Sequence, residues 1–358
     1  MSKARQLADL GNVYDDGALS NRNLIINGAM QVAQRGTSSS SIGFQTVDRF
    51  RVGTNSTDEL AFIQSQDTDA PNGFTKSFKV AVTTPETSWT TGEWFTVRYT
   101  IEGQDAQLLQ FGQSTAQKTT LSFWVKSSVT GDYAVMFFNS QGSSRGQSFT
   151  YTITSANTWE YKTIVFDGDT AQSFSDSNAA GPDFYFTLSS GPDRQTTDGS
   201  SWQNYSQGMS AYGQTADVGG TASATWQITG VQLEVGDTAT PFEHRSYGDE
   251  LARCQRYYYE LGGVSYYPYF LAAVMNSALV RCVHQHPVPM RASPALSTTN
   301  PTSIDVEGNS VTSLTIDVMT TITAMLNINV STSFAVRDCV RVYNNVSGIS
   351  KIHFDAEL

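Results

Sequence analysis

Apolar and polar residues alternate along most of the chain between Phe44 and Arg245. In LSFWVKSS (121–128), Phe123 and Val125 oppose Trp124 and Lys126. A period of two places one set of side chains in a core and the other outside it. Strand-like segments of this kind are separated by turn residues and lie at 47–52, 75–83, 93–103, 119–128, 132–140, 147–154, 159–169, 183–190 and 224–236. Many short strands without helical patterns between them predict an antiparallel β-sandwich, a jelly roll, over residues 42–245.

A long polar segment, 192–220, interrupts this pattern. It contains many Ser, Gly, Gln and Asp residues and few apolar ones. Loops of this length inside a compact domain are usually functional or flexible. We therefore expect the segment to contribute to a binding surface or to remain irregular.

One short helix is predicted after the jelly roll. Ser246, with Asp249 three residues later, matches a capping box, and Leu251, Cys254 and Tyr258 then lie on one helical face. We predict a linking helix of about a dozen residues within 246–262. Two roles fit it equally well: three copies meeting on an axis, or a helix packed on its own chain.

Residues 263–358 predict a smaller C-terminal β domain, a small sandwich that forms the tip. Its expected strands are 269–283, 303–308, 313–319, 323–331, 339–345 and 351–358, and the three prolines of PVPMRASPAL (287–296) require an extended segment. A unit of this size is marginal alone, which favours an oligomer. The fold class predicted for the whole chain is therefore all-β: a jelly-roll sandwich and a smaller β domain, joined by one short helix.

The first 41 residues differ from the rest of the chain. Lys3 to Leu10 predict a short helix, the apolar run Leu24–Ile26 stands among turn residues, and RGTSSSSIG (35–43) is a Ser-rich loop. Such a segment is too small to form a core of its own. We interpret residues 1–41 as an N-terminal attachment arm that a neighbouring protein orders.

The composition narrows the classes of partner. Only 15% of the residues are charged, and the net charge is −11. A weakly charged surface rich in Ser, Thr, Gly, Asn and Gln is common in viral appendages and extracellular β proteins. Nucleic acid is a poor partner because phosphate binding needs clustered Lys and Arg. A neutral glycan fits better, whereas an anionic glycan needs a bridging cation or a local basic patch.

Two further expectations concern the compartment. The three cysteines, Cys254, Cys282 and Cys339, are widely spaced and form no CxxC pair, which predicts reduced thiols rather than a zinc or redox motif. The N-terminus lacks the apolar core of a signal peptide, and no apolar run approaches the ~20 residues of a membrane span. We expect a protein assembled in bacterial cytoplasm that is released by lysis and acts outside the cell.

The sequence contains no clear motif for catalysis. None of the four histidines lies in a nucleophile motif, and the pair in HQH (284–286) is either a weak metal site or a solvated or interface pair. Glu93, Glu102, Asp105 and Asp183 are carboxylates of the type that glycosidases use, but the sequence gives no separation between them. We predict no catalytic residues and no cofactor. The acidic turns 167–169 and 176–183 are compatible with a structural calcium ion or with ordinary loops.

Aromatic side chains in polar surroundings are better candidates for a site. Sugar C–H groups pack on aromatic rings, and sugar hydroxyls pair with amide, acid or guanidinium groups. The aromatic residues in alternating strands, Trp124, Trp159 and Trp226, are expected in the core. The predicted glycan-binding residues are Trp89, Trp94, Arg98, Gln104, Trp202, Asn204, Tyr205 and Tyr212.

Several stretches resemble one family. NRNLIINGAMQVAQRGTS (21–38), VDRF (47–50), TIEGQDAQLLQFG (100–112), LSFWVKSS (121–128), the run 228–258, PVPMRASPAL and the closing FDAEL resemble bacteriophage tail fibre proteins of the marine and cyanophage type. The middle part looks like a carbohydrate-binding-module jelly roll. The resemblance implies a homotrimeric fibre or spike, joined to baseplate or tail proteins through its N-terminus, that recognises host polysaccharide such as lipopolysaccharide.

The sequence therefore predicts a virion tail protein that adsorbs the phage to its host by binding a surface glycan without cutting it. Two alternatives from other classes stay open. One is a depolymerase that cleaves the polysaccharide. The other is a purely structural virion decoration or capsid fibre.

Overall fold

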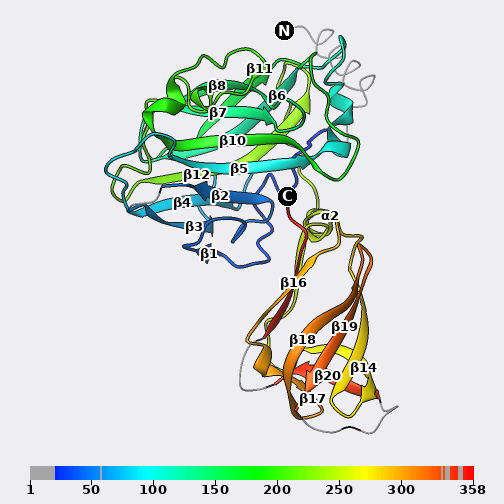
Figure 1. The fold of residues 1–358 in the computed structure, drawn as a ribbon. Coiled ribbons are helices and arrows are strands. Elements are labelled where there is room, and N and C mark those ends of the chain that lie inside the picture. The colour runs from blue at the N-terminus through cyan, green and yellow to red at the C-terminus, as the bar shows by residue number, and fades with distance from the viewer. Residues whose placement is uncertain (1–20, 57–58, 332–333, 335–338, 346–349) are drawn as a thin grey trace. The chain divides into compact units, whose positions relative to one another are not determined.

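All strand pairings among the described residues are antiparallel. The computed structural model describes residues 21–56, 59–331, 334, 339–345 and 350–358. The chain divides into two units, the first ending at Tyr247 and the second beginning at Gly248. The predicted all-β class, with a jelly-roll sandwich and a smaller C-terminal β unit, is confirmed (Figure 1). The predicted helix at Lys3–Leu10 lies outside the described residues.

Unit 1 is a sandwich of two six-stranded sheets. Sheet A has the order β1 (Ser38–Ser39), β3 (Ala61–Asp67), β4 (Ser77–Thr84), β12 (Thr225–Val235), β6 (Thr119–Ser127) and β9 (Glu160–Phe166). Sheet B has the order β11 (Gln203–Asn204), β8 (Arg145–Ile153), β7 (Gly131–Asn139), β10 (Ala180–Ser190), β5 (Trp94–Glu102) and β2 (Phe50–Thr54). Strands β6 and β7 are consecutive in sequence but lie in different sheets, as a jelly roll requires.

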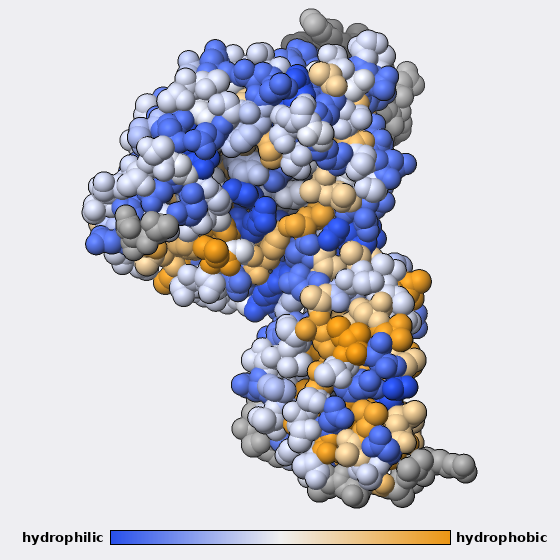
Figure 2. Space-filling model, viewed as in Figure 1, coloured by the Kyte–Doolittle hydropathy of each residue, from blue (hydrophilic) through white to orange (hydrophobic). Residues whose placement is uncertain are grey.

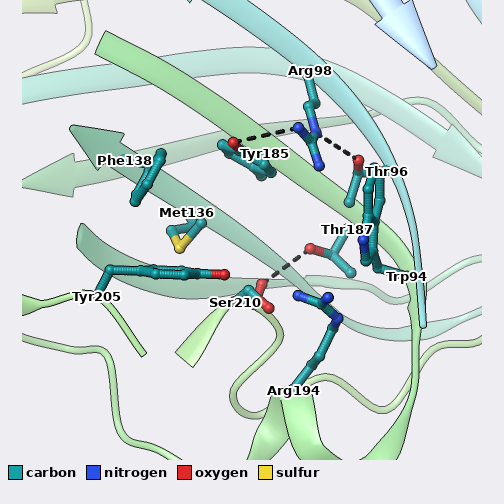
Figure 3. A pocket seen from close by; sticks show the side chains of 10 residues that line it. All are labelled: Trp94, Thr96, Arg98, Met136, Phe138, Tyr185, Thr187, Arg194, Tyr205 and Ser210. Carbon is teal, nitrogen blue, oxygen red and sulfur yellow. Dashed lines mark hydrogen bonds between the residues drawn. The ribbon is translucent and has the colours of Figure 1, made fainter. Parts of the chain in front are cut away.

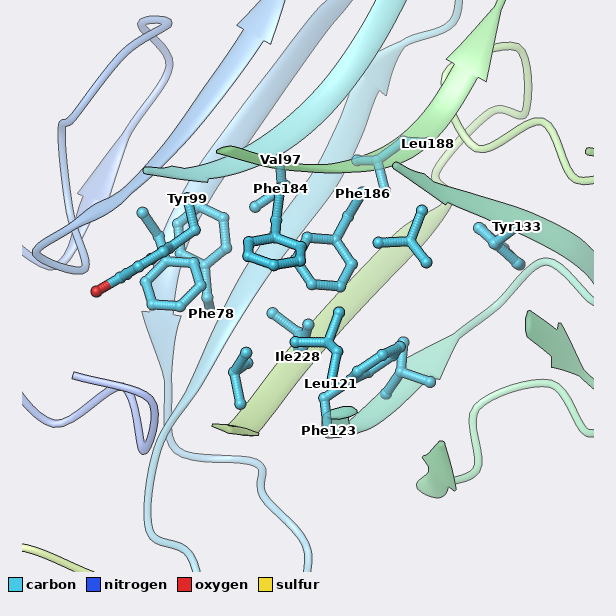
Figure 4. Close-up of a cluster of buried hydrophobic side chains, with 14 of the residues drawn as sticks. Phe78, Val97, Tyr99, Leu121, Phe123, Tyr133, Phe184, Phe186, Leu188 and Ile228 are labelled. Carbon is cyan, nitrogen blue, oxygen red and sulfur yellow. The ribbon is translucent and has the colours of Figure 1, made fainter. Parts of the chain in front are cut away.

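The core lies between the inner faces of these sheets (Figure 4). On β5 the odd positions Val97 and Tyr99 are buried, and on β10 the even positions Phe184 and Phe186 are buried. The alternation therefore sends the other parity of each strand to the outer face of sheet B. Trp226 is fully buried, as expected. Trp124 and Trp159 are only partly buried, so their predicted core position is wrong. Trp124 has the parity opposite to buried Phe123 and packs against the tilted ring of Tyr161 on the outer face of sheet A.

Residues 21–41 pack into unit 1. Ile25, Met30 and Val32 are fully buried, and Asn27 hydrogen-bonds through its side chain to the carbonyls of Val32 and Asp48. The apolar run Leu24–Ile26 thus completes the sandwich core of its own chain. Only residues 1–20 of the predicted arm remain outside the described residues, and their attachment role stays a prediction.

The polar segment 192–220 is ordered by a few buried anchors. It contains the short 3-10 helices η2 (Pro192–Gln195) and η3 (Gln207–Met209), with strand β11 between them. Met209, Ala211 and Val218 are fully buried although the segment is polar overall. A Cβ on Gly199 would lie 1.9 Å from the Ser148 hydroxyl oxygen, so only glycine permits this close approach to β8. The segment therefore forms a fixed wall along sheet B.

Unit 2 consists of a barrel and a small sheet. The closed barrel has the order β14 (Pro268–Asn276), β15 (Leu279–Gln285), β19 (Thr323–Val330), β18 (Asn309–Met319), β17 (Ile304–Val306) and β20 (Cys339–Asn344). The sheet has the order β13 (Tyr258–Gly262), β21 (Lys351–Asp355) and β16 (Ala295–Thr299), and η4 (Pro301–Ser303) precedes β17. The predicted single strand 269–283 is a hairpin, because Ser277 and Ala278 turn the chain between β14 and β15.

The helix is shorter than predicted. Helix α2 spans Tyr247–Gln255, and Cys254 is its fully buried residue. Tyr258, expected on the helical face, belongs to β13 and pairs with Asp355 of β21. Aromatic residues favour strands, and this pairing overrides the helical spacing. The remaining 3-10 element, η1 (Gly103–Leu109), follows β5.

The absence of disulfides among the described residues agrees with the reduced thiols predicted from the sequence. All three cysteines lie in the described part of the chain and none forms a disulfide: Cys254 and Cys282 are buried, and Cys339 is exposed. Among the described residues, no helix is both long and apolar enough to cross a membrane.

Candidate functional site

A cavity of about 220 Å³ lies on the outer face of sheet B (Figure 3). Its floor comes from the outward positions of three neighbouring strands, and its wall comes from the segment 192–220. The lining residues are Trp94, Thr96, Arg98, Met136, Phe138, Tyr185, Thr187, Arg194, Tyr205 and Ser210. Four of them are aromatic, two are arginines and none is a carboxylate.

The centre of the floor is an arginine between two rings. Trp94 and Arg98 stand four residues apart on β5, so both point to the same face. Strand register places Tyr185 of β10 opposite Arg98. The guanidinium carbon of Arg98 lies 4.1 Å from the ring centroid of Trp94 and 4.1 Å from that of Tyr185. Both aromatic rings thus stabilise the cation.

Hydrogen bonds fix the orientation of Arg98. Its Nε donates to the Thr96 hydroxyl at 3.2 Å, and its Nη1 donates to the Tyr185 hydroxyl at 3.4 Å. Burial lowers the pKa of Arg98, but a guanidinium with an ordinary pKa above 12 remains charged at neutral pH. Burial likewise raises the pKa of Tyr185, so its hydroxyl stays protonated. Nη2 has no hydrogen-bond partner among the described residues.

The Trp94 ring occupies space that is open because residue 53 is a glycine. A Cβ on Gly53 of β2 would lie 2.7 Å from Cζ3 of the Trp94 indole. The ring therefore lies over the backbone of β2, in the space that any other residue at position 53 would fill. Next to Gly53 on the same strand face, Arg51 pairs in register with Arg98.

A second arginine approaches from the wall. Arg194 of η2 donates through Nε and Nη2 to the Gly92 carbonyl, at 3.1 and 2.6 Å, and through Nε to the Glu93 carbonyl at 3.0 Å. These bonds tie the segment 192–220 to the turn that precedes β5. Figure 3 shows Arg98 and Arg194 entering the cavity from opposite sides. Nη1 of Arg194 has no partner among the described residues.

Tyr205 completes the wall. Its backbone N–H donates to the Ser144 carbonyl at 2.8 Å, and its ring packs edge-on against Phe138 with centroids 4.9 Å apart. Its side chain is 36% exposed, and its hydroxyl points toward the cavity (Figure 3). A partly exposed ring beside hydroxyl and guanidinium donors is the chemistry expected for a sugar ring.

The predicted site residues separate into two groups. Trp94, Arg98 and Tyr205 come together in the cavity. Trp202 instead packs edge-on against Phe111 and Phe137 of the core, with its Nε1 donating to the Asp167 carbonyl at 2.6 Å. Trp89 packs against the core and donates to Asp217 at 3.0 Å. Gln104, Asn204 and Tyr212 are exposed and outside the cavity lining, with Gln104 bonded to Glu102 and Asn204 to Arg145.

Sequence reasoning missed six polar or aromatic lining residues: Thr96, Phe138, Tyr185, Thr187, Arg194 and Ser210. Phe138 and Tyr185 carry a usable signal, because each is an aromatic residue on the outward parity of a buried strand. Thr187 has the same parity, and it donates to the Ser210 carbonyl at 3.1 Å. Arg194 and Ser210 lie in an irregular segment and carry no sequence signal.

No metal-binding group is present among the described residues: no three His, Cys, Asp or Glu side chains cluster to hold an ion. In the acidic turn 167–169, Asp167 lies 3.5 Å from Lys118 and Asp169 lies 2.8 Å from Arg145. These carboxylates are thus balanced by cations of the protein itself.

The His pair of unit 2 forms an internal network. His284 and His286 both contact the Tyr259 hydroxyl, at 2.9 and 2.6 Å, and His286 is buried. Burial lowers the pKa of His284 to about 4 and also lowers that of His286. Both imidazoles are therefore neutral near pH 7, and their role here is to hydrogen-bond Tyr259.

Unit 2 has a larger and more open hollow of about 620 Å³. Tyr266, Phe270, Leu271 and Tyr343 line part of it. Its one lining cation, Arg341, forms a two-bond ion pair with Glu307 at 2.9 and 3.0 Å. Its charge is therefore already neutralised, in contrast to Arg98 and Arg194.

Solved structures with a similar fold match this chain at low TM-scores. No family model matches the sequence and no curated protein matches it, so the resemblance to tail fibre proteins stays a prediction. The enzymatically active domain of bacteriophage CBA120 tailspike protein 4 is 18% identical, with a TM-score of 0.33, over 60% of this chain but only 22% of that chain. A family 11 carbohydrate-binding module of Clostridium thermocellum is 11% identical, with a TM-score of 0.29, over 58% and 98% of the two chains. A xylan-binding domain of family 22 is 9% identical, with a TM-score of 0.30, over 59% and 99%. Scores of this size carry no argument about what this chain binds.

Proposed function

We propose that this chain is a bacteriophage tail fibre or spike protein that adsorbs the virion to its host by binding a surface polysaccharide. The binding site is the cavity on the outer face of sheet B. The observation that carries the proposal is the stack of Trp94, Arg98 and Tyr185, with Tyr205 on the opposite wall. Ring faces receive the C–H surface of a sugar, while Arg98 and the hydroxyl groups bind its oxygens.

The proposed action is binding without cleavage. Glycoside hydrolysis commonly uses two carboxylates that flank the scissile bond. None of the lining residues is an aspartate or glutamate, which supports a binding role. Incubating the full chain with host polysaccharide and measuring chain length by size-exclusion chromatography tests this part. Shortened chains would establish the depolymerase alternative.

The proposed assembly is a homotrimer attached to baseplate or tail proteins through its N-terminus. Hydrophobic residues gather on the visible surface of unit 2 (Figure 2), which supports association. Among the exposed residues of this unit, Leu271 is 71% exposed and Val283 is 63% exposed. Three sites on one particle raise avidity by about 10²–10⁴ when they engage together. Light scattering on the full chain tests the trimer, and a monomer mass at micromolar concentration would contradict it.

The central experiment compares two aromatic pairs. The double variant Trp94→Ala, Tyr205→Ala removes rings from the cavity, whereas Trp124→Ala, Tyr161→Ala removes a contacting aromatic pair from the outer face of sheet A. Host adsorption and glycan-array binding are measured for both. We expect the first pair to abolish binding and the second to leave it intact.

Unchanged adsorption in the cavity variant would move the receptor site elsewhere, with the unit 2 hollow the next surface to test. Absence of adsorption and of glycan binding in the unaltered chain, while it remains bound to virions, would favour the structural-decoration alternative.

A further inference from the structure

The cavity concentrates positive charge in an acidic protein. The chain has 33 Asp and Glu against 22 Lys and Arg, yet the cavity lining holds two arginines and no carboxylate. Beside the lining, Arg51 pairs in register with Arg98, and its Nε is buried with no hydrogen-bond partner among the described residues. Three guanidinium groups therefore gather on the outer face of sheet B.

The nearby carboxylates do not neutralise these arginines by ion pairs. Asp183, 8% exposed and on the same strand parity as Tyr185, accepts from the Thr100 hydroxyl at 3.1 Å and attracts Arg51 and Arg98 without pairing with them. Asp193 accepts from the Gly92 N–H at 2.8 Å and from the Gln207 side chain at 2.5 Å. Within the described chain, no salt bridge within 4 Å joins Arg51, Arg98 or Arg194 to either group.

The arginines also keep specific donors for a ligand. The guanidinium carbon of Arg98 lies over the Trp94 and Tyr185 rings, and Thr96 and Tyr185 each accept one hydrogen bond, from Nε and Nη1. The N–H groups of Nη2 have no acceptor among the described residues, and Arg98 lines the cavity. Arg194 likewise keeps Nη1 after Nε and Nη2 have bound the Gly92 turn. Planar guanidinium edges of this kind bind an oxyanion through paired hydrogen bonds.

We propose that the cavity selects an anionic sugar residue, carboxylated or sulfated, whose acidic group binds between Arg98 and Arg194. This inference rests on the proposed sugar-binding function and narrows its ligand class. The ring of the sugar lies against Trp94 or Tyr205. Its acidic group accepts hydrogen bonds from Nη2 of Arg98 and Nη1 of Arg194, for which the described chain supplies no acceptor. The local basic patch that an anionic glycan requires is thus present despite the net charge of −11.

The test uses polymer pairs that differ only in charge. Calorimetry measures binding of the full chain to polygalacturonate and to the same polymer after chemical reduction of its carboxyl groups. A second pair, dextran sulfate and dextran, separates sulfate from carboxylate recognition. We expect at least one charged polymer to bind about tenfold or more tightly than its neutral partner, because charge-assisted hydrogen bonds are the stronger kind.

Two single-charge variants locate the effect. Arg98→Gln is expected to abolish the preference for the charged polymer, whereas Lys79→Gln, which removes one charge from the outer face of sheet A, keeps it. Melting temperatures confirm that both variants are folded. If Arg98→Gln does not fold, Arg51→Gln provides a second variant, which lowers the same preference without touching the stack.

Each remaining result is decisive. Equal binding of charged and neutral polymers, or binding of the neutral ones alone, overturns the anionic selectivity while the sugar-binding function stands. A preference that Lys79→Gln weakens as much as Arg98→Gln does would show general electrostatic attraction and would also overturn it. Binding of no polymer, together with no adsorption to host cells, contradicts the proposed function itself.

Discussion

The outer faces of the two sheets in unit 1 hold their cations in different ways. On sheet A, Lys79 pairs with Asp67 at 2.8 Å, and Lys126 pairs with Asp69. On sheet B, Arg98 is held by aromatic rings and neutral oxygens instead of a carboxylate. A cation that is paired within the protein has little left for a ligand, whereas one held by rings keeps its charge available. The same sandwich thus has one outer face whose cations are paired with carboxylates and one whose arginines keep donors available, which is the face proposed to bind.

The largest expected change in glycan affinity comes from placing a carboxylate beside the arginines of sheet B, as sheet A has beside its lysines. Tyr205→Glu places a carboxylate at the cavity wall, and Tyr205→Gln removes the same ring without adding charge. We expect Tyr205→Glu to bind an acidic glycan at least about tenfold more weakly than Tyr205→Gln, because the new carboxylate competes for the arginines. Calorimetry measures both affinities, and equal values would show that the arginines do not bind the ligand's charge.

A smaller effect is expected from moving the Trp94 ring. Gly53→Val puts a Cβ where Cζ3 of Trp94 lies, 2.7 Å away, so the ring must leave the floor. Because Gly53 does not adopt a positive φ, valine suits its strand backbone. We expect affinity to fall about three- to tenfold while the protein stays folded. Gly248→Ala in helix α2, where a Cβ meets nothing within 4 Å, serves as the control and should leave binding unchanged.

The two faces should also respond differently to acid. The hydrogen bond from Lys126 lowers the pKa of Asp69 below its ordinary 3.8, so the stability that this pair contributes is present above pH 3.8 and is lost as pH falls through the lowered pKa. Burial raises the pKa of Asp183, which Arg51 and Arg98 oppose only in part. Its contribution is fully present below pH 3.8 and is lost as pH rises through the raised pKa.

Melting temperatures between pH 2 and pH 8 distinguish these contributions. Asp69→Asn should melt about 1–3 °C below the unaltered chain at pH 7, and this gap should close in acid. The melting temperature of Asp183→Asn should instead rise relative to that of the unaltered chain as pH increases. Parallel curves for the two variants would mean that the faces do not differ in this respect.

The smallest effect is expected from the pairs of sheet A themselves. Lys79→Gln breaks a partly exposed ion pair with Asp67. Such pairs contribute about 0–1 kcal/mol, so the melting temperature should change by no more than a few degrees and glycan affinity should stay the same. A clear loss of affinity would indicate that sheet A takes part in binding.

The strand pattern predicted the sandwich because parity is local information. Phe123 and Val125 turn inward as expected, and the same parity rule places Trp124 outside, against the general tendency of tryptophan to be buried. Strand β3 was missed because its two buried positions are Phe62 and Gln64, so its sequence AFIQSQD shows no alternation of apolar and polar residues. Its pairing with β4 supplies what its own sequence lacks.

The site was predicted only in part, because register and loop packing are not local. Trp94 and Arg98 share a face through their spacing on β5, which the sequence contains. That Tyr185 stands opposite Arg98 depends on the pairing of strands 87 residues apart. Trp202 was placed in the site from its polar surroundings, but it fills the space beside Phe111 and Phe137. Nothing in the composition of a loop reveals which of its rings is an anchor.

The buried residues that hold the segment 192–220 in place affect which of its positions can change during evolution. Met209, Ala211 and Val218 hold this segment in place, while Arg194 and Tyr205 project from it into the cavity. Substitutions at the projecting positions change the cavity lining without disturbing the anchors or the strands beneath. Under the proposed function, a virus whose host receptor changes can therefore adapt through a few substitutions on an unchanged framework.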